Sequence, residues 1–281
     1  MYVLIADSGS TKTDWVLLQG SQVIKRLKTI GFNPYFQTRD QISLELLNNL
    51  KPHLSDELSE ISTVYYYGTG CSTCENCTLI QDSLKLTLNV HHINVSHDLL
   101  GAARALCKNG WGIACILGTG SNSCLYNGEM ILENVPSTGY LWSDYGGGSQ
   151  IGKHFIREYF EGRLPRELKI AFELAGYNHE VILNNVYKNG VPGKYLASVA
   201  LFLSKYLDHP FVIKILIECF DSFFIQQIDK YTDSKKFNVH TVGSIGYFYR
   251  ELIAATAKRH GYQVGTVLQS PMDGLINYHS D

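Results

Sequence analysis

The sequence predicts an α/β fold in two lobes, and two observations support this prediction. Apolar runs typical of buried strands alternate with segments of helical periodicity along the 281 residues. One order of features also occurs twice, namely a buried strand, a loop of Gly, Ser and Thr, and a β-hairpin, with the two loops at 7–10 and 118–121. This repetition indicates a duplicated fold. We place the boundary near Asn109-Gly110, which gives lobes of 1–108 and 109–281.

The elements of the first lobe follow from local patterns. YVLIAD (2–7) is a continuous apolar run, as expected of a strand buried on both faces. Apolar residues at helical spacing and Gly-rich or Pro-containing breaks define the other elements. We expect a hairpin over 14–29 with its turn at 19–22, a helix over 38–50, a strand over 63–70, a helix over 76–88, a strand over 93–96 and a helix over 97–107.

The second lobe opens with the repeated unit and continues with helices. The stretch 112–134 predicts a strand, a glycine loop and a hairpin with an Asn127-Gly128 turn. Periodic apolar segments make 148–231 mostly helical, including 195–207 and 211–231. After these we expect a strand over 238–243, a helix from Ser244, a strand over 262–268 and a last helix after Pro271.

Composition and charge exclude several classes of protein. Hydrophobic residues make up 45% and charged residues 18% of the chain, which is a globular composition. The formal net charge of −2 gives no global field that would recruit nucleic acid or an anionic membrane. No basic segment with a following apolar core marks a secretory signal, and the seven cysteines form an odd set. We therefore expect a cytoplasmic protein that binds neither nucleic acid nor membrane.

The loop after the first strand, ADSGSTKTD (6–14), predicts an anion or metal site. A P-loop is excluded because Lys12 follows Thr11 and not a glycine. An aspartate at the end of a strand, Asp7, can hold Mg²⁺ through water. Gly9 lets backbone N–H groups approach an anion, and the following residues reach phosphate oxygens: Ser10, Thr11 and Lys12. The alternative for this stretch is a tight turn capped by Asp and Ser.

Two further glycine loops, at 117–123 and 242–248, follow the first one along the chain. LGTGSNS (117–123) offers Gly118, Thr119 and Gly120. VGSIGYF (242–248) joins a strand to a helix, so that Gly243 and Ser244 suit a phosphate or the ribose of a nucleotide. Each loop by itself is also compatible with an ordinary hairpin connection or strand–helix turn. The co-occurrence of the three loops in this order favours nucleotide binding.

DSGSTKTDW, GTGS and VGSIGYF resemble the first phosphate, second phosphate and adenosine loops of the actin-like sugar kinase superfamily. Within it the sequence is most similar to the N-acetylglucosamine kinase branch, which is grouped with the ATPases that activate benzoyl-CoA reductase and 2-hydroxyacyl-CoA dehydratase. The resemblance runs from Asp7 to PMDGLINY (271–278). It implies an actin-like ATPase fold of duplicated ribonuclease H-like domains, with the active site in the cleft, and ATP and Mg²⁺ as cofactors.

The resemblance also implies roles for individual residues. HDLLGAARA (97–105) looks like the family segment in which an aspartate at a helix start is the catalytic base, which is Asp98 here. GFNPY (31–35) and GYLWSDYGGGSQIG (139–152) look like segments that contact the sugar. The sugar-binding residues implied in this way are Asn33, Asp98, Asn122 and Asp144. The glycines at 146–148 depart from the animal enzymes, which affects the path of the loop after Asp144.

The chemistry of Asp98 can be argued independently of the resemblance. A sugar hydroxyl that attacks a γ-phosphoryl group needs a carboxylate to accept its proton. The start of a helix keeps such an aspartate ionised near neutral pH. The alternatives are structural: an N-cap for Asp98, a turn residue before Pro34 for Asn33, and a polar loop residue for Asp144.

CSTCENC (71–77) contains three cysteines at C-x-x-C spacing, which could ligate zinc or an iron–sulfur cluster. A fourth ligand is missing locally, and Glu75 or a distant Cys or His would have to supply it. No second cysteine motif occurs in the glycine-rich stretch 146–152, so we expect ordinary helix-start and core cysteines. Two enzyme hypotheses result. The first is an ATP-dependent kinase of a free amino sugar, namely N-acetylglucosamine at its 6-hydroxyl, and the alternative is an ATPase activator of a dehydratase or reductase. A non-catalytic sugar sensor is a third hypothesis, and a homodimer is compatible with the aromatic helix at 220–231.

Overall fold

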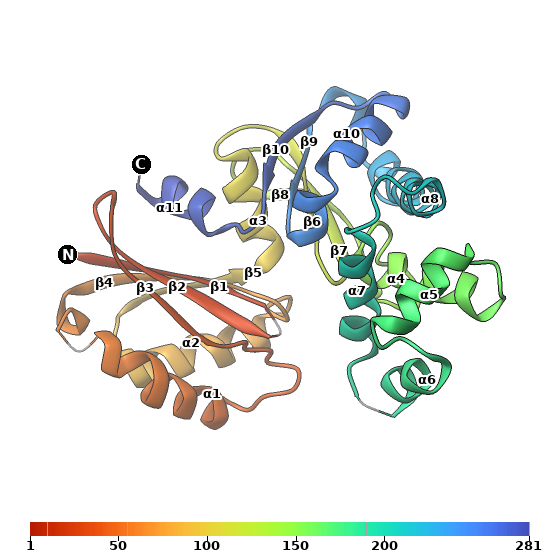
Figure 1. Cartoon of the computed structure of the whole chain (residues 1–281). Helices are drawn as coiled ribbons and strands as arrows, with labels where there is room; N and C mark the ends of the chain where they lie inside the picture. The colour runs from red at the N-terminus through yellow and green to blue at the C-terminus, as the bar shows by residue number, and fades with distance from the viewer. Residues whose placement is uncertain (10, 55, 189, 281) are drawn as a thin grey trace. The chain divides into compact units, whose positions relative to one another are not determined.

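The structure is a computed structural model that describes residues 1–281 except 10, 55, 189 and 281. The contacts group the chain into two units, each built around its own sheet (Figure 1). Unit 1 contains Met1–Asn109 and Ser270–Asp281, and unit 2 contains Gly110–Gln269. The sequence-based division into 1–108 and 109–281 keeps the last helix with the second lobe, whereas the contacts group it with the first.

Unit 1 is a mixed sheet with helices on both faces. Its sheet has the order β3-β2-β1-β4-β5 over the described residues, and the β1–β2 and β2–β3 pairs are antiparallel whereas β1–β4 and β4–β5 are parallel. The elements are β1 (Tyr2–Ser8), β2 (Lys12–Gln19), β3 (Gln22–Ile30), α1 (Arg39–Glu45), β4 (Ile61–Gly68), α2 (Cys74–Leu88), β5 (His92–His97), α3 (Asp98–Cys107) and α11 (Met272–Ser280).

Unit 2 repeats this topology. Its sheet has the order β8-β7-β6-β9-β10 over the described residues, again with two antiparallel pairs followed by two parallel pairs. The identical sequence of pairings in the two sheets confirms the predicted duplication and the α/β class. The elements are β6 (Gly112–Leu117), β7 (Ser121–Tyr126), β8 (Ile131–Val135), α4 (Gly148–Phe160), α5 (Arg166–Leu174), α6 (His179–Tyr187), α7 (Pro192–Leu203), α8 (Pro210–Gln226), β9 (Val239–Val242), α9 (Ser244–Phe248), α10 (Arg250–Arg259) and β10 (Val264–Leu268).

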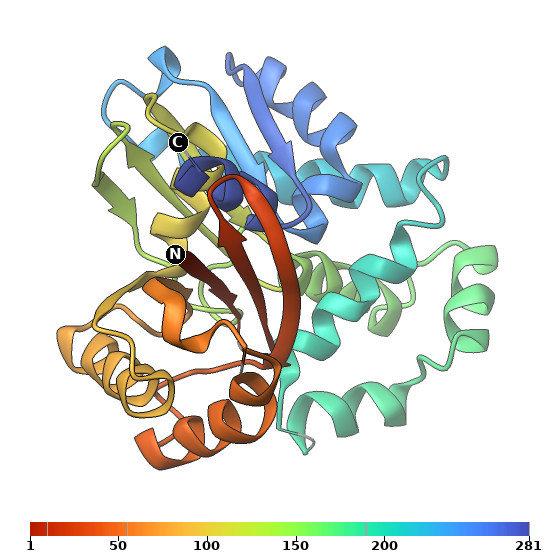
Figure 2. The same ribbon diagram turned by 90° about the vertical axis from the view of Figure 1, so that its left-hand side faces the viewer.

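Alternation along the strands of unit 1 assigns side chains to the two faces of its sheet. Val64 and Tyr66 of β4 lie in a core that also contains residues of α1 and α2. Tyr65 and Tyr67 lie on the opposite face, where α11 packs against α3 and the ring of His279 stacks on Tyr65 at 3.9 Å between centroids. Figures 1 and 2 show α1 and α2 on one side of this sheet and α11 on the other.

The predicted helix over 38–50 begins where expected but changes its winding. Thr38 caps α1, because its hydroxyl accepts the Gln41 N–H while the Gln41 side chain accepts the Thr38 N–H. After Glu45 the chain continues as a π-helical turn over Leu46–Leu50 and a 3₁₀ turn over Lys51–Leu54. Leu46, Leu50 and Leu54 are fully buried, so the apolar spacing that predicted the helix is used for packing over the whole segment.

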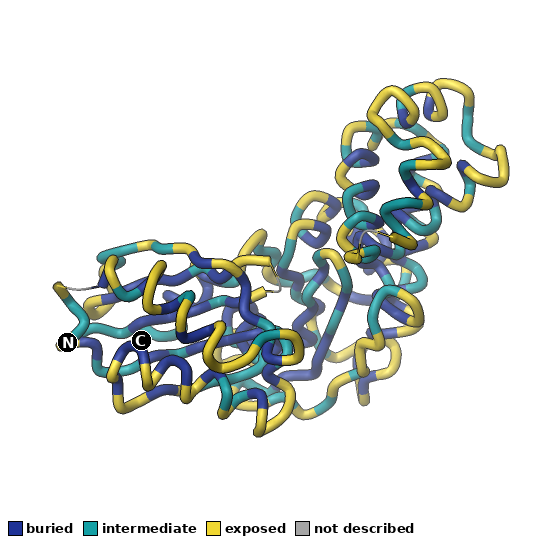
Figure 3. The backbone as a smooth tube through the Cα atoms, turned by 90° about the horizontal axis from the view of Figure 1, so that it is seen from below, coloured by how far each residue is buried: buried dark blue, intermediate teal, exposed yellow. Residues whose placement is uncertain are grey.

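The core of unit 2 lies between one face of its sheet and its helices. Ile113, Cys115 and Leu117 alternate along β6 and are fully buried in a cluster with residues of α4, α7, α8 and α10. Figure 3 colours the backbone by burial and shows many exposed residues on the outer helical turns. Gly152 of α4 allows a close approach of α7, since a Cβ at this position would clash with the carbonyl oxygen of Leu196. Among the described residues no helix is long and apolar enough to span a membrane.

Candidate active site

The parallel strands of unit 1 bring two predicted site carboxylates to one edge of the sheet. β1, β4 and β5 run parallel and in register, so that Ser8 lies beside Gly68 and Gly68 beside His97. Asp7 is the penultimate residue of β1, and Asp98 directly follows β5 as the first residue of α3. The carboxyl ends of parallel strands are the usual position of ligand sites in α/β sheets.

Asp7 is electrostatically unfavourable as an isolated anion. Burial, the negative charge of Asp98 and the negative charge of Asp14 raise the pKa of Asp7 to about 7, and Lys12 opposes this shift. Asp14 is the cross-strand partner of Asp7 on β2, which explains the repulsion. A cation beside Asp7 would relieve it. The described residues contain no group of three or more His, Cys, Asp or Glu arranged to hold a metal, so a Mg²⁺ ion here would need further ligands from water or phosphate.

The first glycine loop is a tight turn between β1 and β2. The Gly9 N–H donates to the carbonyl of Lys12 at 3.0 Å, and Thr11 is exposed. The Lys12 ammonium donates to Asp14 at 2.6 Å while its side chain remains 62% exposed. An exposed ion pair of this kind contributes little stability, so Lys12 can exchange Asp14 for a ligand. Ser10, also predicted to bind phosphate, lies outside the described residues.

Asn33 lies against the loop that follows β4. Its side-chain oxygen accepts the Tyr35 N–H at 3.1 Å, and its backbone N–H donates to Gln37 at 2.6 Å. A Cβ at Gly70 would lie 2.7 Å from the same side-chain oxygen, so only glycine allows this approach. The side chain of Asn33 therefore stabilises the turn around Pro34. Asn33 lies in unit 1, as Asp98 does.

Asp98 is not the N-cap of its helix, and the alternative reading of this residue as a cap is wrong. His97 is the N-cap of α3, with its Nδ1 3.0 Å from the Leu99 backbone N. The Asp98 carboxylate lies in the first turn with its Oδ1 2.8 Å from the same Nδ1, and the Asp98 side chain is 25% exposed. Sequence reasoning overlooked His97, although a histidine adjacent to a candidate base was a signal for it.

The second glycine loop, in unit 2, is attached to the start of α4. The Gly118 N–H donates to the carbonyl of Gly120 at 3.0 Å. The Gly148 N–H donates to Gly118 at 2.9 Å, and the Ser149 N–H donates to Thr119 at 2.8 Å. A Cβ at Gly147 would lie 2.7 Å from the backbone of Gly120. Gly147 thus allows a close approach of two backbones, whereas a Cβ at Gly146 would lie 2.8 Å from the Phe223 side chain and one at Gly148 would lie 3.0 Å from the Ala197 side chain.

Asp144 holds this loop with a buried carboxylate. It is only 6% exposed and adopts a positive φ of 57°. Its oxygens accept the Ser121 N–H at 3.1 Å and the hydroxyls of Ser137 and Ser149, each at 3.3 Å. A Cβ at Gly120 would lie 2.6 Å from the carboxylate. The structure thus gives Asp144 a supporting contact with the glycine loop, which the sequence did not indicate.

Asn122 is part of the hairpin that follows this loop. Its side-chain oxygen accepts the Ser123 N–H at 2.9 Å and the Asn134 amide of β8 at 3.0 Å. The side chain is partly buried on β7. Asn122 and Asp144 are consequently both engaged by their own unit in this structure.

The third loop meets the second at the edge of the unit 2 sheet. Gly243 has a φ of 117°, and a Cβ there would lie 2.4 Å from the carbonyl oxygen of Leu117, at the end of β6. Ser244 then begins α9. The structure therefore brings the predicted second phosphate loop and the predicted adenosine loop together.

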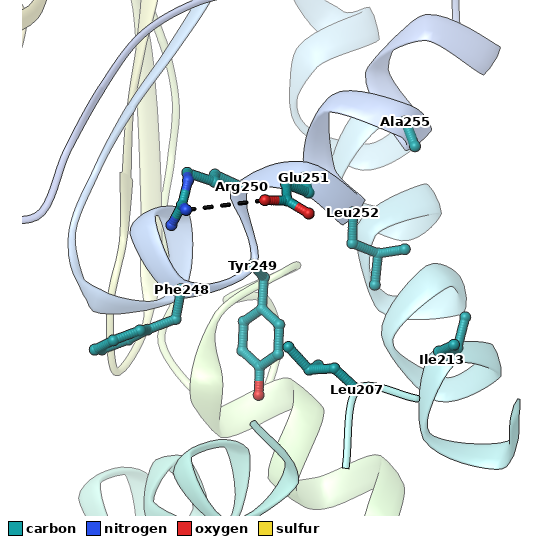
Figure 4. A pocket seen from close by; sticks show the side chains of 8 residues that line it. All are labelled: Leu207, Ile213, Phe248, Tyr249, Arg250, Glu251, Leu252 and Ala255. Carbon is teal, nitrogen blue, oxygen red and sulfur yellow. Dashed lines mark ion pairs between the residues drawn. The ribbon is translucent and has the colours of Figure 1, made fainter. Parts of the chain in front are cut away.

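A cavity of about 520 Å³ lies beyond α9 in unit 2 (Figure 4). The ring of Phe248, at the end of α9, borders it and is 47% exposed. The cavity combines apolar walls with the charged pair Arg250–Glu251, as ligand sites commonly do. It is lined by Leu207, Ile213, Phe248, Tyr249, Arg250, Glu251, Leu252 and Ala255.

The three clustered cysteines differ in their surroundings. Cys71 is buried, Cys74 is exposed at the first position of α2, and Cys77 is partly buried. The Cys77 thiol donates to the carbonyl of Cys71 at 3.4 Å. Burial raises the pKa of Cys71 to about 12, so this thiol stays protonated at neutral pH. Since metals bind the thiolate, this environment disfavours Cys71 as a ligand.

Comparisons with known proteins identify the family. No protein-family model matches the chain. The structure is similar to a solved protein of Porphyromonas gingivalis assigned as an N-acetylglucosamine kinase, with a TM-score of 0.94 and 38% identity over 99% of this chain and 98% of the other. A protein of Chromobacterium violaceum with the same assignment shares the fold, with a TM-score of 0.73 and 13% identity over 99% and 98% of the two chains.

Among curated proteins the chain is similar to the N-acetylmuramic acid/N-acetylglucosamine kinase of Clostridium acetobutylicum. The two are 25% identical over 231 residues, which are 77% of this chain and 74% of the relative. The similarity to the Porphyromonas protein covers 99% of this chain and so extends over both units. The chain belongs to the N-acetylglucosamine kinase family, a family of carbohydrate kinases with the actin-like ATPase fold.

Proposed function

We propose that the protein transfers the γ-phosphoryl group of ATP to the 6-hydroxyl of a free amino sugar, and that this sugar is N-acetylglucosamine. The observation that carries the proposal is the position of Asp98, at the start of α3 and at the edge where β1, β4 and β5 end. The curated relative acts on N-acetylmuramic acid and N-acetylglucosamine according to its name, which supports an amino sugar as substrate.

The proposal gives separate roles to the residues around the sugar and to those around the phosphates. Asp98 accepts the proton of the attacking hydroxyl. Asn33, Asn122 and Asp144 bind the sugar. Asp7 holds Mg²⁺ through water, and Mg²⁺ when bound neutralises phosphate charge. Thr11 and Lys12 with Gly9 and Ser10 contact the outer phosphates.

The nucleotide half of the proposal uses unit 2. The loop of Gly118, Thr119 and Gly120 binds the phosphates, and Gly243 and Ser244 approach the adenosine. The cavity next to α9 has apolar walls that suit the base. Most of its lining residues follow the predicted adenosine loop in the sequence. The exposed ring of Phe248 is suited to stacking on a purine.

The test is ADP release from MgATP with N-acetylglucosamine, N-acetylmuramic acid, glucosamine, N-acetylmannosamine, glucose or no sugar. We expect strong stimulation by N-acetylglucosamine. Asp98→Asn should lower kcat by about 10²-fold or more and leave ATP binding intact, since a general base contributes about this much. Asp82→Asn, at an exposed position of α2 in the same unit, is the matched control and should behave as the unmodified protein.

ATP hydrolysis that is indifferent to every sugar would contradict the proposal. That result would favour the ATPase activator as the function. The protein would then be purified anaerobically and its absorption spectrum examined for an iron–sulfur cluster, for which Cys71, Cys74 and Cys77 are the candidate ligands. Full activity of Asp98→Asn with a sugar would reject Asp98 as the base while leaving the kinase assignment in place.

A further inference from the structure

His97 contacts the proposed catalytic base and the helix that carries it with one ring nitrogen. It is the last residue of β5 and the N-cap of α3. Its Nδ1 lies 2.8 Å from Oδ1 of Asp98 and 3.0 Å from the backbone N of Leu99. The side chains of His97 and Asp98 are 30% and 25% exposed, so both are partly shielded from water.

These two contacts demand opposite states of the nitrogen. The Leu99 N–H can donate only to an unprotonated Nδ1, whereas an ionised Asp98 can be contacted only by a protonated Nδ1. If both groups lacked a proton, the lone pairs of Nδ1 and Oδ1 would face each other at 2.8 Å. A proton therefore lies between Nδ1 and Oδ1, and its position decides whether Asp98 is a carboxylate or a carboxylic acid.

The charges around the pair favour the proton on His97 when Asp98 is ionised. Asp98 interacts with Asp7 of β1, with Tyr66 of β4 and with Cys71 of the loop after β4. None of these three side chains supplies a positive charge. Burial lowers the pKa of His97, but the hydrogen bond to Asp98 and its negative charge outweigh burial, and the net effect is a raised pKa.

We propose that His97 is a positioning residue that donates its Nδ1–H to Oδ1 of Asp98, and thereby keeps Oδ2 ionised and aimed at the sugar hydroxyl. In the reaction, the O–H bond of the sugar breaks as the new O–P bond forms, and the proton moves to Oδ2. The Nδ1 proton stays on His97 throughout. This inference rests on the proposed function for the identity of the reaction, whereas the hydrogen bond itself can be tested without it.

The first experiment reads the hydrogen bond by NMR of ¹⁵N-histidine-labelled protein. We expect His97 to carry its proton on Nδ1 in the neutral ring and to titrate above the ordinary histidine value. In Asp98→Asn this elevation should disappear, because the carboxylate that causes it is gone. A neutral His97 with its proton on Nε2, and a titration that Asp98→Asn leaves unchanged, would overturn the proposal.

The second experiment separates positioning from helix capping. His97→Ala removes the imidazole from the N-cap position together with the Asp98 contact, while His97→Ser places there a hydroxyl that can accept a backbone N–H of α3 without the imidazole. We expect Ser to recover the melting temperature that Ala loses, but both variants to lose about 10-fold or more in kcat with little change in the KM for ATP. Their pH profiles should also lack the limb that reports His97. His92→Ser, at the exposed first residue of β5, is the control.

Recovery of both stability and kcat in His97→Ser would show that His97 is only a cap and would overturn the proposal. The two experiments also separate this inference from the proposed function. Absence of sugar phosphorylation together with the expected NMR result would reject the kinase reaction but retain the Nδ1–Oδ1 hydrogen bond. Sugar phosphorylation that His97→Ser leaves unaffected would reject the positioning role and retain the kinase.

Discussion

At neutral pH the carboxyl group of Asp7 is only partly ionised, because burial and the charges of Asp98 and Asp14 raise its pKa to about 7. An unfolded aspartate titrates near 3.8, so the folded protein retains a proton that the unfolded chain has lost once the pH exceeds this value. The contribution of Asp7 to stability therefore falls as the pH rises from about 4 to about 7, and remains unfavourable above that. Magnesium would remove this penalty by favouring the anion.

Asp7→Asn should raise the melting temperature at pH 8 in the absence of Mg²⁺ and nucleotide. The neutral amide avoids the penalty, whose upper limit is about 4 kcal/mol for a shift of this size. At pH 4 the difference from the unmodified protein should shrink, and the stabilisation by MgATP should be lost. Thermal unfolding at both pH values measures this. A destabilised variant at pH 8 would show that Asp7 is ionised and satisfied within the protein.

At the scale of elements, the glycine loop of unit 2 is held by contacts with a later segment. Asp144 accepts hydrogen bonds from Ser121, Ser137 and Ser149, and so connects the start of β7 to the start of α4. A buried carboxylate with these partners is stabilising as long as it is present, but its removal leaves buried donors without acceptors.

Asp144→Ala should destabilise the protein by about 2–4 kcal/mol, since it unpairs the buried Ser121 N–H and Ser149 hydroxyl and places alanine at a positive φ. Asp144→Asn should lose less, because asparagine tolerates this backbone conformation. Asp233→Asn is the control, at an exposed aspartate with a φ of 54° whose partner is Lys236. Denaturant unfolding measures all three. Equal stability of Asp144→Ala and the control would refute the supporting role of Asp144.

The sequence predicted most elements because their signals are local. The buried strand at 2–7, the hairpins and the helix over 97–107 were expected within about two residues of β1, β2–β3, β6–β8 and α3. The contacts of Asp144 depend on how the fold places Ser121, Ser137 and Ser149 around its carboxylate, and no local pattern encodes them. His97, in contrast, contacts its chain neighbours Asp98 and Leu99, so its place beside the candidate base was a local signal. The roles proposed for the site residues remain predictions.

At the scale of the whole molecule, the last helix belongs to the unit that begins the chain. α11 packs against α3, and Gly274 allows this contact, because a Cβ there would lie 2.5 Å from the carbonyl oxygen of Ala105. Tyr67 links the same elements, since its hydroxyl lies 2.8 Å from both Arg104 and His279. Burial and the charge of Arg104 lower the pKa of His279 to about 4, so its ring is neutral at physiological pH.

Gly274→Ala should lower the melting temperature, because overpacking costs about 1–3 kcal/mol and a helical glycine-to-alanine change returns only about 1 kcal/mol. Hydrogen exchange should increase in β1, β4 and α3 but not within 110–269. Gly193→Ala, in α7, is the matched control, since its new Cβ would meet its neighbours at 3.6 Å or more. Unchanged exchange in unit 1 would show that α11 does not stabilise it.

The position of α11 also fixes an order of events during synthesis. A ribosome delivers β1–β5 first, yet this sheet receives its covering helix only after residues 110–269 have been made. Until then Tyr65, Tyr67 and the surface of α3 are not covered by α11. Unit 2, in contrast, can bury its whole core as soon as Leu268 has left the ribosome. Nascent-chain folding should therefore be completed in the middle of the chain before it is completed at the beginning, and the early strands are the segment that needs protection from aggregation.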